Sequence, residues 1–287
     1  MRKPQGKGPN QHDRTGGVRA TRRLPLWSTL LYPTCLVLVF LGGQVVAGWL
    51  GVAAGQRAAL AALPALACLV LRLPRRVSYR WGAAQPWRSL GLAGESTVSL
   101  TNLCKGVGLA LLLLIWLAAV LALVGLSSWL PRLTIGLLIN ALVLGLGVGI
   151  AEELLFRGWL LGELSLQLGR RSALWVHALI FSLVHIRFNL PPLALLGLLL
   201  GLLLLGLLLG RLRQGDGQIW AAVGLHGGLV GGWFLLHNGL IELSDNNEIW
   251  TGPANPIGGL PGLLGLAVVL LLSGWRWPSP GGPRGQR

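Results

Sequence analysis

Six ionisable residues within the apolar runs of this sequence are of the types that acid–base chemistry uses. They are Glu152, Glu153, Arg157, His177, His185 and His226. A charged group at the centre of a lipid bilayer costs at least about 2.5 to 3.5 kcal/mol on insertion scales. Such residues are therefore expected to have either a partner or a function.

Two of these residues are spaced to form an ion pair within one helix. Glu153 and Arg157 are four residues apart, with the glutamate first, so they share a helix face in the favourable order. Glu152 lies about 100° further round the same helix, without this partner. We therefore expect Glu153 and Arg157 to support the site and Glu152 to be free for chemistry. His177 is predicted to be a packing residue.

Glu152 can act with two histidines from other apolar segments, His185 and His226. A carboxylate and two imidazoles supply what hydrolysis by an activated water requires. One basic group takes the proton, and fixed donors stand where negative charge develops. No hydroxyl or thiol nucleophile stands beside a base in these motifs, so we expect no covalent intermediate.

These residues fall into three motifs that resemble a known family. The motifs are E-E-x-x-x-R at Glu152 to Arg157, F-x-x-x-H at Phe181 to His185, and a third that begins at His226. In order and spacing they resemble the CPBP family of intramembrane proteases, which is related to the type II CAAX prenyl proteases. The resemblance covers roughly Leu133 to Leu236.

The resemblance implies roles for the individual residues. Glu152 with His185 would activate a water without a metal or other cofactor, and His226 would donate a hydrogen bond to the oxyanion. Glu153, Arg157 and Phe181 would hold the site in shape. The implied function is an intramembrane endopeptidase that acts on a membrane protein or a peptide.

The third motif departs from the family pattern. The family has H-x-x-x-N, whereas this chain has Val230 four residues after His226. Loss of one oxyanion donor typically lowers the rate by about 10² to 10³. Asn189, Asn238 or a backbone amide near Gly227 and Gly228 could replace the donor. The alternative function is a non-enzymatic membrane protein of the same fold, with a binding, chaperone or immunity-type role.

Two further alternatives have less support in the sequence. Two carboxylates and two histidines could bind zinc, but the sequence contains no H-E-x-x-H motif. A transporter could use Glu152 and His185 as a proton relay, but no two halves with matching broken helices stand out. We therefore expect no metal at the site.

The segments that carry these residues indicate a membrane protein. Of the 287 residues, 53% are hydrophobic and only 11% are charged, unlike a soluble domain. The apolar runs lack the alternation of barrel strands, which predicts an all-α, polytopic transmembrane bundle of about eight spans. The predicted spans are Trp27–Leu50, Ala58–Leu73, Val107–Leu130, Leu133–Leu164, Ser172–Phe188, Pro192–Gly210, Ile219–Leu236 and Leu260–Ser273.

The net charge of +15 follows the loops and the ends of the chain. In an eight-span model most Lys and Arg residues fall on the side of the N-terminus, which predicts that both termini are cytoplasmic. This distribution explains the charge without a nucleic-acid partner and leaves the lipid bilayer as the expected surroundings. We expect the plasma membrane, with an internal photosynthetic membrane as the alternative.

The sequence predicts a single membrane domain with short tails. Residues 1–26 would be a disordered basic tail, residues 27–273 the transmembrane domain with a catalytic core at about 133–236, and residues 274–287 a cytoplasmic tail. The arginine-rich segment from Arg72 to Leu100 is predicted to be interfacial or loop-like.

Overall fold

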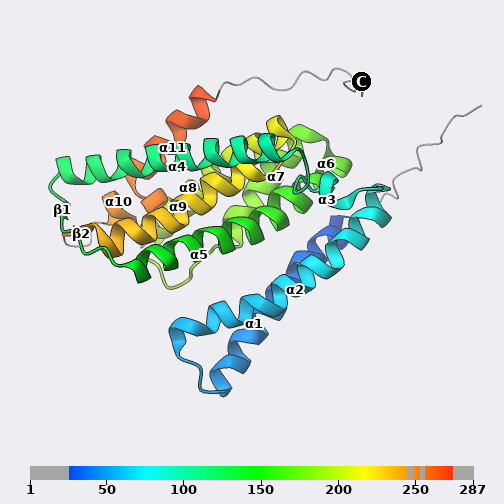
Figure 1. The fold of residues 1–287 in the computed structure, drawn as a ribbon, viewed down its shortest axis with the longest axis horizontal. Coiled ribbons are helices and arrows are strands. Elements are labelled where there is room, and N and C mark those ends of the chain that lie inside the picture. The colour runs from blue at the N-terminus through cyan, green and yellow to red at the C-terminus, as the bar shows by residue number, and fades with distance from the viewer. Residues whose placement is uncertain (1–25, 245–247, 253–255, 274–287) are drawn as a thin grey trace, which may run out of the picture.

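The computed structural model describes residues 26–244, 248–252 and 256–273 and has an all-α architecture (Figure 1). The predicted all-α class is therefore confirmed. The predicted tails, 1–26 and 274–287, lie outside the described residues except for Leu26. The division of the chain into one membrane domain and two tails stays a prediction.

The longer helices make up most of the described chain. They are α1 (Leu26–Trp49), α2 (Ala54–Trp81), α4 (Ser96–Leu123), α5 (Ile135–Glu153), α7 (Arg170–Leu183), α8 (Pro192–Asp216), α9 (Trp220–Gly239) and α11 (Leu260–Leu272). A π-helical segment, Leu154–Leu160, joins α5 to α6 (Leu161–Leu168), so the helical run continues from Ile135 to Leu168. The short elements are α3 (Pro86–Ser89), α10 (Glu248–Thr251) and a 3-10 turn at Pro256–Gly258.

One small sheet lies at the end of the molecule opposite α3 and α6 (Figure 1). Strands β1 (Ser127–Trp129) and β2 (Ile241–Leu243) pair in antiparallel register, with Ser128 opposite Glu242. The pairing ties the connection between α4 and α5 to the end of α9.

Four described helices are long and apolar enough to cross a membrane. They cover Trp27–Trp49, Ser96–Leu123, Ile135–Leu168 and Pro192–Asp216. Helices of this length and composition define an integral membrane protein. The predicted total of eight spans and the orientation of the termini stay predictions.

Helix α9 lies between α4 and α5 (Figure 1), and glycines form both contacts. A Cβ atom at Gly224 would collide with the carbonyl oxygen of Leu103 on α4. On the other side, a Cβ atom at Gly145 of α5 would lie 2.6 Å from the carbonyl oxygen of Gly227. Small residues let membrane helices approach backbone to backbone. The glycines of α9 therefore bring its side chains close to those of α5.

One prediction about a helix boundary is wrong, and another, which left two alternatives open, is narrowed. Helix α7 ends at Leu183, so His185 lies in the turn after the helix rather than within the predicted span. Helix α2 continues to Trp81, so the first part of the segment predicted to be interfacial or loop-like is helical and not a loop. The buried side chains of Leu73 and Val77 explain the longer helix, because they pack into the hydrophobic core.

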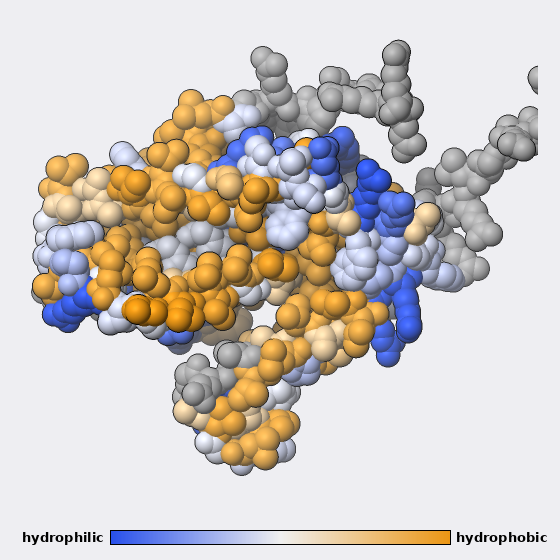
Figure 2. All heavy atoms as spheres, in the orientation of Figure 1, coloured by the Kyte–Doolittle hydropathy of each residue, from blue (hydrophilic) through white to orange (hydrophobic). Residues whose placement is uncertain are grey.

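The hairpin of α1 and α2 extends away from the other helices toward its closed end (Figure 1). Figure 2 shows apolar side chains over the visible face of the hairpin and of the helical body, whereas hydrophilic side chains gather near α3 and α6. At that end, Arg80 Nη2 lies 2.6 Å from Glu163 Oε1, and Trp81 Nε1 donates to Glu163 Oε2 at 2.6 Å. These contacts join the hairpin to α6.

Candidate functional site

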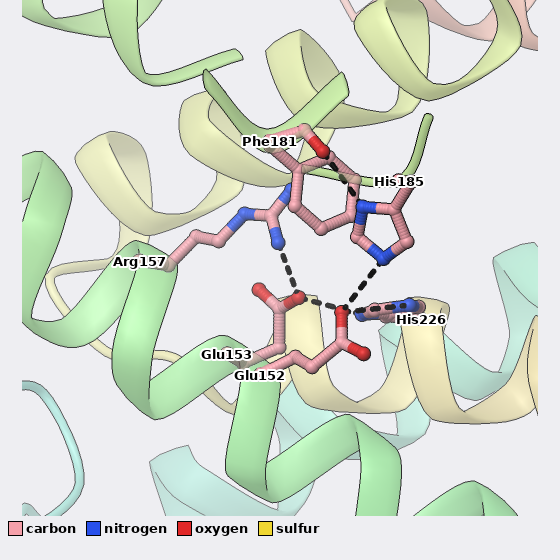
Figure 3. A network of polar contacts seen from close by, with 6 residues as sticks. All are labelled: Glu152, Glu153, Arg157, Phe181, His185 and His226. Atoms are coloured by element: carbon pink, nitrogen blue, oxygen red, sulfur yellow. Dashed lines mark hydrogen bonds and ion pairs between the residues drawn. The ribbon is translucent and has the colours of Figure 1, made fainter. Parts of the chain in front are cut away.

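The structure brings six of the residues singled out by the sequence into one cluster (Figure 3). They come from the end of α5, the π-helical segment, the end of α7 and the middle of α9. They are Glu152, Glu153, Arg157, Phe181, His185 and His226. Elements that are far apart in the sequence thus meet at a common polar site.

Glu153 is the buried centre of this cluster. Arg157 Nη1 donates to Glu153 Oε1 at 2.7 Å, and both side chains are fully buried. The predicted pairing within one helix is therefore present. His226 Nδ1 lies 2.8 Å from the same oxygen, which makes Glu153 the link between α5 and α9. The sequence did not indicate this second contact, because it joins residues that are far apart in the chain.

Glu152 faces the two histidines with one carboxyl oxygen. Its Oε2 lies 3.6 Å from His185 Nε2 and 4.0 Å from His226 Nε2. The Glu152 side chain is 30% exposed, yet this oxygen is itself buried and has no hydrogen-bond partner among the described residues. Glu152 is thus a carboxyl with two imidazoles within a short distance, as water activation requires.

His185 is held in place by its own helix end. Its Nδ1 lies 2.7 Å from the carbonyl oxygen of Phe181, one turn earlier. This contact points Nε2 toward Glu152 (Figure 3). A hydrogen bond on one ring nitrogen fixes the role of the other nitrogen. The turn after α7 therefore orients His185 through its contact with the carbonyl oxygen of Phe181.

The ring of Phe181 contacts three members of the cluster. The Arg157 guanidinium lies 4.0 Å from the ring centroid, a distance that allows a cation–π interaction. The rings of His185 and His226 approach it edge-on, with centroids 4.9 Å and 5.8 Å away. Phe181 is fully buried, so it forms an apolar wall against which both imidazoles pack.

The π-helical segment Leu154–Leu160 begins directly after the glutamate pair. Such single-turn widenings are rare and occur frequently at functional sites. Within it, the Phe156 ring packs against Phe181 at a centroid distance of 5.1 Å. No residue pattern in the sequence signals a π-turn, and sequence reasoning missed this feature.

The remaining candidates lie at different distances from the cluster. Asn238 donates to the carbonyl oxygen of Phe234 at 2.8 Å, and it lies about 18 Å along α9 from His226 at 1.5 Å per residue. Asn189 is exposed in the connection after His185. Val230 follows His226 by one turn and is partly buried. The structure therefore does not bring Asn238 to the site.

His177 is buried on α7, and neither of its ring nitrogens has a hydrogen-bond partner in the described part of the chain. It lies close to Gly210 of α8, where an added Cβ would be 3.4 Å from the imidazole. This position is that of a side chain packed between two helices, as predicted. Among the described residues, no group of three or more His, Cys, Asp or Glu side chains is arranged to hold a metal ion.

The fold and the site together define an integral membrane protein of all-α class with a carboxyl, a buried ion pair and two histidines at one polar cluster. Its central region is similar to one known family. The model of the type II CAAX prenyl endopeptidase Rce1-like family matches residues 109–231, from α4 to α9. The predicted resemblance is thereby confirmed, and the match includes every residue of the cluster. Neither the curated proteins nor the solved structures contain a match to this chain.

Proposed function

We propose that this protein is an intramembrane endopeptidase that hydrolyses a peptide bond with an activated water. The observation that carries the proposal is the position of Glu152 Oε2, 3.6 Å and 4.0 Å from the Nε2 atoms of His185 and His226. The family match over residues 109–231 adds support, because it names an endopeptidase.

In the proposed reaction, Glu152 and His185 act on the attacking water. Glu152 takes a proton from the water as it attacks the carbonyl carbon, and His185 holds the water in line. His226 donates a hydrogen bond to the oxygen of the tetrahedral intermediate. Glu153, Arg157 and Phe181 keep these three groups in position.

The test is cleavage of a mixed panel of fluorogenic transmembrane and C-terminal peptides by the purified protein in detergent. Glu152→Gln should lower the rate by about 10² to 10⁴, the usual contribution of a general base. Glu242→Gln is the matched control, because Glu242 is exposed on β2, remote in the sequence from the cluster. A strong chelator should leave the wild-type rate unchanged, whereas inhibition by the chelator would favour zinc.

A second candidate function rests on Val230. Its aliphatic side chain follows His226 by one turn of α9 and offers no donor to an oxyanion. The second candidate is a non-enzymatic protein that keeps the fold and binds other membrane proteins. Folded wild type that cleaves no peptide of the panel, together with a Val230→Asn variant that does, would favour this candidate.

The proposal includes the surroundings of the protein. We propose that both termini are cytoplasmic, with the basic end of the bundle near α3 and α6 facing the cytoplasm, in accord with the positive-inside pattern. The proposed membrane is the plasma membrane, and the proposed partners are lipid and a membrane-protein or peptide substrate. Accessibility of single cysteines introduced at the two ends to a membrane-impermeant reagent would test the orientation.

A further inference from the structure

Both imidazoles that face Glu152 already use their Nδ1 atoms elsewhere. His185 Nδ1 contacts the carbonyl oxygen of Phe181, and a carbonyl oxygen can only accept, so Nδ1 carries the hydrogen. His226 Nδ1 contacts Glu153 Oε1, which also accepts from Arg157 Nη1. This carboxylate oxygen is an acceptor for both, so His226 Nδ1 carries a hydrogen as well.

A neutral imidazole has one donor nitrogen and one acceptor nitrogen. With Nδ1–H on both rings, each neutral ring presents an Nε2 lone pair to Glu152. The Glu152 Oε2 atom is buried and has no hydrogen-bond partner among the described residues. An ionised Glu152 would therefore place three acceptors opposite one another, and a buried acceptor without a donor costs about 1 to 3 kcal/mol or more.

The charges of the cluster lead to the same conclusion. Glu152 and Glu153, if both are ionised, carry two negative charges against the single positive charge of Arg157. One more proton makes the cluster neutral, which lowers the cost of burying it. His177 is the other buried histidine, and it forms no ion pair in the part of the chain that the structure describes. On α4, which packs against α9, Lys105 is exposed and donates to Asn102.

We propose that Glu152, His185 and His226 share one proton among their three facing atoms in the resting protein. This proton is additional to the two Nδ1 hydrogens. At any moment it makes one of the two contacts, at 3.6 Å or at 4.0 Å, donor to acceptor instead of acceptor against acceptor. Glu153 is then a positioning residue, because its contact with His226 Nδ1 turns Nε2 of that ring toward Glu152.

The use of this proton in catalysis rests on the proposed function. During peptide hydrolysis, the hydroxide part of the water adds to the carbonyl carbon, and the other proton of the water passes to the site. The shared proton goes to the amine nitrogen as the carbon–nitrogen bond breaks. The site therefore ends with the same number of protons as it began with and needs no exchange with bulk water during the step.

The proton can be counted without any enzymatic activity. Nitrogen NMR of protein labelled with ¹⁵N in the histidine rings separates doubly protonated rings from the two neutral tautomers. It would be recorded in detergent at about pH 7.5, where exposed histidines are mostly neutral. The infrared carbonyl band of a protonated carboxyl reports Glu152. His185→Gln, His226→Gln and Glu152→Gln assign the signals by their loss.

We expect a total of one extra proton. It is found on one ring, on both rings in exchange, or on Glu152. In Glu152→Gln the remaining Glu153 and Arg157 already balance, so the extra proton should be lost and both rings should become neutral with Nδ1–H. Glu242→Gln should leave the spectra unchanged. The number of doubly protonated rings and the infrared band of the wild type give the total even if a variant does not fold.

Three results would overturn the proposal. These are a total of no extra proton, a total of two, or a His185 or His226 ring that is neutral with its hydrogen on Nε2. Peptide cleavage is scored separately. A site that holds the proton but cleaves no peptide would contradict the proposed function and leave this inference intact. Cleavage by a site without the proton would support the proposed function and contradict this inference.

Discussion

Two buried ion pairs lie on the same helical run from Ile135 to Leu168, and they are built in different ways. Glu153 pairs with Arg157 of the same run, and both side chains are fully buried. Glu163 pairs with Arg80 of α2, and these side chains are 1% and 6% exposed. Each glutamate accepts one further hydrogen bond, from His226 in the first pair and from Trp81 in the second.

The difference between the two ion pairs indicates what each pair can do. The first pair needs only a helical turn to form, so it is present whenever the run from α5 to α6 is folded. It can therefore hold His226 and the site independently of the hairpin. The second pair forms only when α2 lies against α6. It is accordingly a measure of whether the α1–α2 hairpin is docked.

The largest effect is expected from Arg157→Met, which leaves the buried carboxylate of Glu153 without its cation. Breaking a buried pair by removing one partner costs about 3 to 5 kcal/mol. The melting temperature in detergent should fall strongly, and the NMR signal of the His226 ring should shift. Arg187→Met is the matched control, because Arg187 is exposed. Equal melting temperatures for the two variants would contradict a stabilising role of the Glu153–Arg157 pair.

Arg80→Met breaks the second pair and should cost about 3 kcal/mol, at the lower end of the range for buried pairs. The loss is smaller because Glu163 keeps its hydrogen bond from Trp81. The comparison predicts that the ring signals of His185 and His226 stay unchanged while proteolysis within the α1–α2 connection increases. A shift of both ring signals would show instead that the hairpin shapes the site.

The glycine contact between α5 and α9 provides a third test. Gly145→Ala should destabilise the protein by about 1 to 3 kcal/mol through overpacking, since its Cβ would lie 2.6 Å from the carbonyl oxygen of Gly227. Gly147→Ala on the same helix has nothing within 4 Å of the added Cβ, and it should be neutral or slightly stabilising. Equal thermal stability of the two variants would argue against close approach of α5 and α9.

The smallest effect is expected from Trp81→Phe. This change removes the hydrogen bond of 2.6 Å from Trp81 Nε1 to Glu163, together with the outer edge of the indole ring that lies against Gly162. A typical hydrogen bond contributes about 1 kcal/mol net, and somewhat more when one group is charged. In a double-mutant cycle with Arg80→Met, the two losses should not be additive, because both act on Glu163. Additive losses would mean that the two contacts are independent.

The sequence by itself determined the features that depend on local spacing and composition. Continuous apolar runs predicted the all-α membrane class, because a backbone in lipid must satisfy its own hydrogen bonds. The spacing of Glu153 and Arg157 predicted their ion pair, because helix geometry places such residues on one face. The order of the three motifs also indicated a resemblance to the family whose model matches residues 109–231.

Only the tertiary structure decided the contacts between segments that are far apart in the chain. The contact of Glu153 with His226 and the pair of Glu163 with Arg80 depend on which helices become neighbours. Likewise, the turn at His185 and the π-turn after Glu153 are local shapes selected by packing against other helices. The physical reason is that helix propensity and hydropathy act over a few turns, whereas the pairing of helices is decided by the complementarity of whole surfaces.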